Sequence, residues 1–395
     1  EGTVDRRGAR PFRVLQIVPA LDAGGVERTA VDIAAGLAAR GCTALVASQG
    51  GRLTGELESV GGRHVTLPLA SKNPAVMLAN ARRLQRLIAR ERIDIVHARS
   101  RAPAWSALMA ARATSRAFVT TYHGAYGQGI GIAGAMKGVY NGVMARGDVV
   151  IANSGFTRDL ILARHGPDPS RVRVIHRGTD LARFDPGRVS DADIAARRGR
   201  WGLTAEERVV LLPGRLTGWK GHRVLLEAAA TLAAPGIALV FVGDPQGRDG
   251  YVASLDNLAA ERGLRLVLPG HDADMAPVYA AADIVVVPST EPEAFGRTAV
   301  EAQAMGRPVI VADHGAMPET VIAPPEPGWT GWRTPPGDAD ALASALQEAL
   351  SLDGASRAAL SARARAQAAR FGLARMVSQT LAVYDELLSA PSPRG

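Results

Sequence analysis

Residues 283–311 read DIVVVPSTEPEAFGRTAVEAQAMGRPVIV. Two short runs rich in valine and isoleucine, 283–287 and 308–311, flank a loop and a stretch with helical spacing. Runs that are apolar at nearly every position are typical of strands buried on both faces. A buried strand, a helix and a second buried strand in this order predict one unit of a parallel sheet that is covered by helices.

The same alternation continues through most of the chain. Further strands are expected in the first half at 13–18, 43–48, 64–67, 94–98, 118–122, 148–153 and 172–176. In the second half they are expected at 208–213, 237–243 and 265–268. Strand signals stop across 181–207, and 338–390 is helical throughout. About twelve units exceed the eight of an α/β barrel, so the pattern predicts an α/β fold with two parallel sheets.

The net charge differs between the two halves of the chain. Residues 1–190 contain 27 Lys and Arg against 14 Asp and Glu, a net charge of +13, whereas residues 191–395 contain 19 against 24, a net charge of −5. Halves of opposite sign favour two domains with different tasks. A basic half suits nucleic acid, an anionic membrane surface or phosphorylated substrates. Nucleic acid is disfavoured because the first half has few aromatic residues and its arginines gather in one helical stretch, 82–92.

The composition excludes several other classes of protein. Apolar residues make up 47% of the chain, which is enough for sizeable cores. No apolar run approaches the ~18–20 residues of a membrane-spanning helix. The single cysteine, Cys42, excludes a disulfide framework and a thiolate zinc cluster. Residues 1–11 are polar and show no signal peptide, so we expect a cytoplasmic location.

Residues that follow the predicted strands are the first candidates for a site, because ligands bind at the carboxyl ends of strands in open parallel sheets. The stretch Gly24-Gly25-Val26-Glu27 opens a helix, where paired glycines let backbone N–H groups approach an anion; a plain loop is the alternative. Gly129-x-Gly131-x-x-Gly134 matches a dinucleotide fingerprint but lies too far from its strand. Segment 127–146 is instead expected to form a loop and an apolar helix face, which either packs in the core or touches a membrane.

The segment GRLTGWKG, residues 214–221, follows a predicted strand and precedes a helix. It is not a P-loop, because Trp219 precedes the lysine and Gly221 follows it. Arg215 and Lys220 nevertheless suit a diphosphate clamp, in which arginine offers a planar fork and lysine a point charge. Two solvated surface cations are the alternative interpretation.

The loop and helix within residues 283–311 form a second candidate site. The loop carries Glu293 and Gly296, and the helix is expected to begin near Arg297 or Thr298 with its free N–H groups pointing at the loop. A phosphate would bind at this helix N-terminus, while Glu293 and Glu301 accept hydrogen bonds from the hydroxyls of a sugar diphosphate. In the alternative interpretation, Glu301 only complements the helix dipole.

Several motifs in a fixed order connect the chain with a known family. They are GGVE (24–27), TYHG (121–124), NSGFT (153–157), RGTD (177–180), GRLTGWKG (214–221) and the Glu-x7-Glu of Glu293 and Glu301. With these motifs the chain resembles the family 4 retaining glycosyltransferases of GT-B fold over about residues 12–390. Two stretches depart from the family. Arg177-Gly178-Thr179-Asp180 stands where Asn-Gly-Val/Ile-Asp is usual, and Arg297 stands where an apolar residue is usual.

The resemblance implies two Rossmann-like domains that face each other across a cleft. Residues 12–185 would take the acceptor, residues 186–370 the nucleotide-sugar donor, and residues 371–390 would form a helix that crosses back to the first domain. The implied reaction transfers a sugar from a UDP- or GDP-sugar to an acceptor hydroxyl with retention, and needs neither metal nor cofactor. Asp272 and Asp274 have the spacing of a metal-binding pair but are interpreted as a helix start.

The resemblance also implies the residues of the site. The catalytic residues are then His123, Arg215, Lys220 and Glu293. The donor-binding residues are then Gly24, Gly25, Arg215, Lys220, Gly270, Glu293, Ala294, Phe295, Gly296, Thr298 and Glu301. The two cations would neutralise the departing diphosphate, Glu293 would hold the transferred sugar, Glu301 the ribose, and His123 would lie over the sugar.

Other functions are compatible with parts of the pattern. A GT-B sugar-nucleotide 2-epimerase would share the fold and the ligand, although it uses other carboxylates. A binding module without catalysis is disfavoured, because all four charged residues of the implied donor site are present. The expected acceptor is a glycan or a lipid-linked molecule of bacterial envelope or lipopolysaccharide synthesis. The anionic inner face of the cell membrane is a candidate partner, and the sequence does not indicate an oligomeric state.

Overall fold

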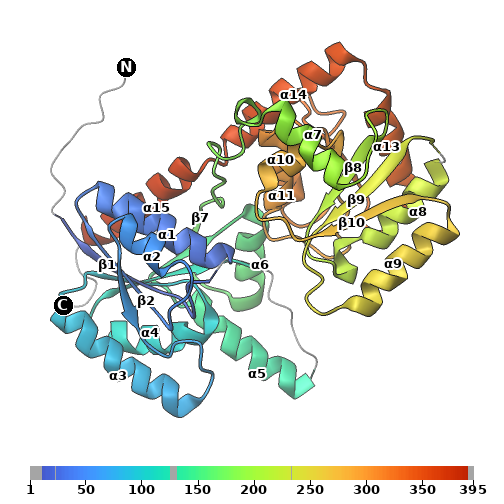
Figure 1. The fold of residues 1–395 in the computed structure, drawn as a ribbon. Helices are drawn as coiled ribbons and strands as arrows, with labels where there is room; N and C mark the ends of the chain where they lie inside the picture. Colours follow the sequence, from blue (N-terminus) through green and yellow to red (C-terminus); the bar gives the residue numbers. More distant parts are fainter. Residues whose placement is uncertain (1–10, 23, 125–130, 233, 390–395) are drawn as a thin grey trace. The chain divides into compact units, whose positions relative to one another are not determined.

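The computed structural model describes residues 11–22, 24–124, 131–232 and 234–389 (Figure 1). The chain divides into two compact units. Unit 1 comprises the residues up to Gly178 and those from Ala374 onward. Unit 2 comprises Thr179–Leu373. Within the described residues each unit contains one parallel sheet accompanied by helices. This confirms the α/β class and the two sheets that the sequence predicts.

Unit 1 is built on a seven-stranded sheet with the strand order β3-β2-β1-β4-β5-β6-β7 among the described residues. Its strands are β1 Arg13–Ile17, β2 Thr43–Ser48, β3 Arg63–Thr66, β4 Ile95–Ala98, β5 Ala117–Tyr122, β6 Val149–Ala152 and β7 Val172–Val174. Its helices are α1 Gly25–Ala39, α2 Thr54–Ser59, α3 Pro74–Arg90, α4 Arg101–Ala113, α5 Gly131–Gly142, α6 Gly155–His165 and the C-terminal α15 Leu373–Ser389. Gly129, in the fingerprint-like motif, lies outside the described residues.

Unit 2 is built on a six-stranded sheet with the order β10-β9-β8-β11-β12-β13 in the described part of the chain. Its strands are β8 Arg208–Pro213, β9 Ile237–Val242, β10 Arg265–Gly270, β11 Ile284–Val287, β12 Val309–Ala312 and β13 Trp332–Thr334. Its helices are α7 Asp191–Arg200, α8 His222–Leu232, α9 Asp249–Glu261, α10 Met275–Ala280, α11 Arg297–Ala304, α12 Met317–Thr320, α13 Ala339–Ser351 and α14 Gly354–Ala369. The sequence did not predict β13, because three residues pairing only with β12 form no apolar run.

Three aspartates that were expected inside strands lie just before them and join neighbouring strands. Asp94, Asp148 and Asp283 precede β4, β6 and β11. Each carboxylate accepts, over 2.8 Å, the backbone N–H of the first or second residue of the adjacent strand. Each aspartate also donates its own N–H to the carbonyl of that same residue, over 2.7–2.9 Å. This reciprocal pair of hydrogen bonds fixes the register at the amino end of both sheets.

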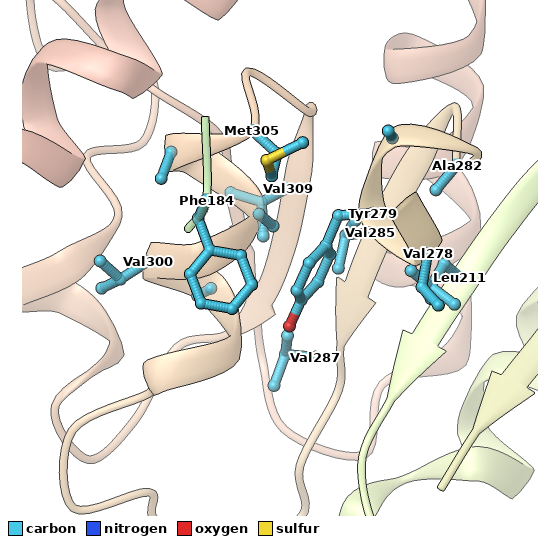
Figure 2. Close-up of a cluster of buried hydrophobic side chains, with 14 of the residues drawn as sticks. Phe184, Leu211, Val278, Tyr279, Ala282, Val285, Val287, Val300, Met305 and Val309 are labelled. Carbon is cyan, nitrogen blue, oxygen red and sulfur yellow. The ribbon is translucent and has the colours of Figure 1, made fainter. Parts of the chain in front are cut away.

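Each unit has its own apolar core on the faces of its sheet. In unit 2, the edge of the Tyr279 ring packs against Phe184 with ring centroids 5.9 Å apart, and both lie among aliphatic side chains of β11 and α11 (Figure 2). In unit 1, the strands contribute Leu15, Val96 and Phe118, which are all fully buried. Strands that are buried on both faces explain the nearly continuous apolar runs in the sequence.

Helix α15 packs on unit 1. Tyr384 is fully buried, and its hydroxyl lies 2.6 Å from Nδ1 of His97 on β4. Near the same end of the helix, Asp385 forms an ion pair with Arg40. Val377 packs where Gly36 of α1 leaves no side chain in the way. Helix α15 is therefore part of the core and of the carboxyl edge of the first sheet.

We expect Asp283→Ala to lower the free energy of unfolding of unit 2 by roughly 1.5–3 kcal/mol, because it removes a charged hydrogen bond to Val209 and leaves that N–H without its partner. Urea unfolding followed by circular dichroism measures the effect. Asp256→Ala, in the exposed face of α9, is the matched control and should change the stability by less than about 0.5 kcal/mol. Equal unfolding midpoints for the two variants would contradict the role of the aspartate.

Candidate functional site

The loop after β8 positions the two cations that the sequence predicts to bind a diphosphate. The chain passes Arg215 and enters α8 through a short 3₁₀ turn, Gly218–Lys220. Gly221 has a φ of +79°, and a Cβ atom there would overlap the carbonyl oxygen of Pro288 at the end of β11. Only glycine accepts both this φ and this close approach. The turn is thereby held beside the loop that follows β11.

Lys220 and Glu293 form a largely buried ion pair at this junction. Lys220 Nζ donates to Glu293 Oε1, and Ser289 Oγ donates to the same oxygen over 2.7 Å. Nζ also lies 4.3 Å from the centroid of the Trp219 ring, within the range of a cation–π contact. The two charged side chains are only 11% and 14% exposed. The structure therefore brings together a cation and a carboxylate that the sequence places 73 positions apart.

Arg215 and Gly270 lie at the same carboxyl edge of the sheet. Arg215 is exposed, and within the described ranges it forms no ion pair. Gly270 ends β10, and its carbonyl accepts the N–H of Gly243, which follows β9. Arg215 is thus free to meet an anion, whereas Lys220 must first leave its carboxylate partner.

Helix α11 supplies the second part of the unit 2 site and begins at Arg297, as predicted. Glu301 accepts a hydrogen bond from Tyr279 Oη over 2.8 Å at one carboxylate oxygen. Arg297 Nε lies 3.1 Å from the other oxygen, and its side chain is 49% exposed. Burial and the neighbouring Glu301 raise the pKa of Tyr279 well above its usual value, so the phenol keeps its proton and continues to donate. Tyr279 is a partner of the site that sequence reasoning missed.

The loop that carries Glu293 is supported from behind by the segment after β12. The carbonyl of Glu293 accepts the N–H of Ala316 over 2.9 Å, and His314 Nε2 lies 2.8 Å from the carbonyl of Ser289. Phe295 is buried with its ring against Phe371, so its side chain belongs to the core. Among the predicted donor residues in and after this loop, Ala294 and Thr298 are partly exposed and Gly296 is buried at the start of α11.

The unit 1 candidate is His123, which directly follows β5. Neither ring nitrogen has a hydrogen-bond partner among the described residues, although both are buried. Its carbonyl accepts a hydrogen bond from Asn153 Nδ2 over 3.3 Å. Burial, followed by the nearby charges of Arg99 and Arg177, lowers the pKa of His123 well below its usual value. The imidazole is therefore neutral at neutral pH.

The two glycines of the GGVE motif surround the N-terminus of α1, where Gly24 is the N-cap and Gly25 the first helical residue. A Cβ atom on Gly25 would overlap the guanidinium of Arg177, and one on Gly24 would overlap the carboxylate of Glu27. The motif thus leaves room for a cation against the backbone at a helix N-terminus.

A buried polar network that sequence reasoning did not foresee lies beneath His123. Arg99 Nε donates to Gln16 Oε1 on β1 over 2.8 Å. His97 Nε2 lies 2.7 Å from Thr121 Oγ1, and its Nδ1 contacts Tyr384 of α15. The sequence signal that could have revealed this network is the position of Arg99 directly after a predicted strand. The link to α15 joins residues 287 positions apart, which no local pattern reveals.

The aspartate pair near α10 has structural partners. Asp274 is the N-cap of α10, and Asp272 forms an ion pair with Arg197 of α7. Within the described residues no group of three or more His, Cys, Asp or Glu side chains is arranged to hold a metal ion.

Comparisons with known proteins match both units. Residues 23–183 match the family described as "Glycosyltransferase Family 4", and residues 193–367 match "Glycosyl transferases group 1". The crystal structure of a glycosyltransferase from Rickettsia africae is 34% identical, with a TM-score of 0.87 over 97% of this chain and 100% of that one.

Two further relatives carry information on ligands. A structure of Anabaena HepE in complex with UDP and glucose is 26% identical, with a TM-score of 0.77 over 96% of this chain and 100% of that one. The D-inositol 3-phosphate glycosyltransferase of Mycobacterium bovis is 35% identical over 248 residues, which is 61% of this chain. The matched segment spans about half, 49%, of the length of that curated relative.

The neutral state of His123 predicts how the stability of unit 1 depends on pH. The unfolded chain binds a proton at this histidine near its ordinary pKa of 6.5, whereas the folded imidazole resists protonation. Its contribution is therefore fully present above that pH and is lost as the pH falls below it, at up to about 1.4 kcal/mol per pH unit.

Urea unfolding at pH 7.5 and 5.5 measures this effect. Because His97 is also buried with a lowered pKa, the informative quantity is the difference between wild type and His123→Asn. The variant should lose less stability on acidification than the wild type. An equal loss in both proteins would show that His123 is protonated normally in the folded state.

Proposed function

This chain belongs to glycosyltransferase family 4, and we propose that it transfers a sugar, with retention of the anomeric configuration, from a nucleoside-diphosphate sugar to an acceptor hydroxyl. The observation that carries this proposal is the buried pair of Lys220 and Glu293, held beside the N-terminus of α11 at the carboxyl edge of the sheet. A sugar diphosphate needs a cation and helix N–H groups for its phosphates, and a carboxylate for its sugar hydroxyls.

The proposed donor is a UDP-sugar. This choice is supported by HepE, a relative whose structure is a complex with UDP and glucose. In the proposal the diphosphate draws Lys220 away from Glu293 and also meets the exposed Arg215. Glu293 is then free to accept hydrogen bonds from the transferred sugar, while Ser289 still holds one of its oxygens. Glu301, oriented by Tyr279, accepts hydrogen bonds from the ribose hydroxyls.

The proposed chemistry depends on stabilising the leaving group. The bond between the anomeric carbon and the diphosphate oxygen breaks, and the acceptor oxygen forms its bond on the same face of the sugar. The acceptor proton passes to the departing diphosphate. Cations that contact the diphosphate stabilise the charge that develops on it, which lowers the barrier more than a strong base would. A neutral His123 suits a hydrogen-bonding role toward the sugar or toward the acceptor hydroxyl.

The proposed acceptor is a glycan or a lipid-linked molecule, bound by the basic unit 1. Helix α3 buries Leu84, Leu87 and Ile88 and exposes Arg82, Arg83, Arg86 and Arg90 on its opposite face. Leu78 on α3 and Val139 on α5 are 48% and 63% exposed. Such a basic surface with apolar side chains suits an anionic membrane surface. Among the described residues, no helix has the length and hydropathy to cross a bilayer.

A phosphorylated small acceptor is the second candidate. The positive charge of the first half of the chain favours it, as does the name of the curated mycobacterial relatives, D-inositol 3-phosphate glycosyltransferase. The two candidates differ in whether the basic surface meets a membrane.

The donor clamp predicts that Arg215→Ala and Lys220→Ala each weaken UDP binding about tenfold or more, because a hydrogen bond to a charged group contributes roughly 1.5–3 kcal/mol. Isothermal titration calorimetry measures the affinity. Arg223→Ala, an exposed cation on the next helix, is the control and should bind UDP like the wild type. Arg215 is exposed, so its variant tests the clamp even where loss of Lys220 disturbs folding. Wild-type affinity in both variants would refute the clamp.

The membrane proposal predicts steep, salt-dependent binding to anionic vesicles. Exposed charges are screened over about 8–10 Å near physiological salt, so binding in a vesicle sedimentation assay should fall as salt rises. Reversal of Arg82, Arg83 and Arg86 to glutamate should abolish binding and leave UDP affinity unchanged. The charge-matched reversal of Arg223, Arg248 and Arg262, which are exposed on unit 2, should reduce binding far less. A wild type that ignores anionic vesicles at low salt would favour the phosphorylated small acceptor.

A further inference from the structure

Unit 1 contains a small pocket that is lined in part by His123 and is formed by residues of this unit. Side chains from the loops after β4, β5, β6 and β7 line it, and Met376 and Thr380 of α15 close one side. It is far smaller than the ~300–1,000 Å³ of pockets that take whole ligands, so it suits a single chemical group of a larger molecule.

Arg99 gives the pocket a buried positive charge. Its side chain is 2% exposed, its Nε donates to Gln16, and its Nη2 lies 3.5 Å from His97 Nδ1. Within the described residues no carboxylate lies at ion-pair distance from it, and Asp32 acts only at longer range. Removing a charge from water is costly unless a counter-charge compensates it. An anion in the pocket would supply that compensation.

Arg177 brings a second guanidinium to the same pocket. Its Nη2 occupies the space that a side chain at Gly25 would fill, so it lies against the backbone at the N-terminus of the fifteen-residue helix α1. Two arginines and a helix N-terminus create a positive potential in one place.

The pocket also presents unsatisfied neutral groups. Both nitrogens of His123 and Oδ1 of Asn153 are buried without a hydrogen-bond partner among the described residues. A neutral imidazole offers one donor and one acceptor, and the amide oxygen offers a further acceptor. A bare anion would leave these acceptors unsatisfied. A hydroxyl group next to an oxyanion would donate to one of these two acceptors, while the oxyanion accepts from the arginines and from the imidazole N–H.

We infer that this pocket is an oxyanion subsite of unit 1 that takes a phosphate or carboxylate group, with an adjoining hydroxyl, of the acceptor substrate. The assignment of the bound group to the acceptor substrate rests on the proposed function, whereas the binding of an oxyanion does not. In this role Arg99 and Arg177 contact the oxyanion and His123 contacts the hydroxyl. The subsite therefore selects acceptors that carry an anionic group next to the hydroxyl that receives the sugar.

The test uses inorganic phosphate as the probe and the full chain, with saturating UDP present to occupy the proposed donor site. Thermal unfolding is followed as phosphate rises, against sodium chloride of equal ionic strength. A bound ligand raises the midpoint as its concentration exceeds the dissociation constant. In the wild type the phosphate-specific shift should saturate. Arg177→Asn and Arg99→Gln should raise the apparent dissociation constant at least tenfold, while Arg173→Asn, a half-exposed arginine of β7, should match the wild type.

UDP affinity, measured for each variant by calorimetry, separates the possible outcomes. Loss of the phosphate shift with UDP affinity within twofold of the wild type supports an acceptor subsite. A tenfold loss of UDP affinity in Arg177→Asn would assign the pocket to the donor diphosphate and overturn the acceptor assignment. A phosphate response equal to that of chloride, or unchanged in Arg177→Asn, would overturn the subsite itself. If the wild type fails to bind UDP, the proposed function is refuted. The phosphate titration of wild type and variants, repeated without UDP, then decides whether the oxyanion subsite exists.

Discussion

The contact between Gly221 and the carbonyl of Pro288 is the constraint on which the site of unit 2 depends. Because a side chain at position 221 would overlap that carbonyl, the loops after β8 and β11 approach each other as backbones. This approach places Lys220 on Glu293 and buries both. The ion pair compensates both charges beside the start of α11, and the proposed donor would separate them. The adjacent start of α11, held from behind by the segment after β12, adds N–H groups in a fixed direction.

Unit 1 differs from unit 2 in the partners of its buried charge. Its buried cation, Arg99, is compensated by neutral groups of β1 and β4 and by no contacting carboxylate in the described part of the chain. Burial, followed by the nearby charges of Arg99 and Arg177, lowers the pKa of His123 and keeps it neutral. Helix α15 closes this arrangement through Tyr384. The buried charges of the proposed donor site in unit 2 are thus paired, whereas the buried Arg99 of unit 1 has neutral partners only among the described residues.

The sequence predicted much of the fold, because buried parallel strands leave long apolar runs and because helices begin where strands end. The sequence predicted the start of α11 to within one residue. It also predicted Lys220 and Glu293 as site residues, and the structure places these two side chains in contact. It missed β13, which is too short to form an apolar run, and it read Asp94, Asp148 and Asp283 as strand residues, although their side chains cap the neighbouring strand. It also missed Tyr279 and the network from Gln16 to Tyr384, since these contacts depend on packing between distant segments.

The central claim is that a sugar leaves a nucleoside diphosphate and joins an acceptor with its anomeric configuration retained. The most direct measurement follows UDP-glucose labelled with ¹³C in the glucose by NMR, in the presence of the protein and an envelope glycan extract. The account predicts that the α-anomeric signal of the donor disappears while an α-linked glycoside signal and free UDP appear. A β-linked product would contradict retention. A label that stays on the nucleotide and moves to the 2-epimer would contradict transfer and establish the chain as an epimerase.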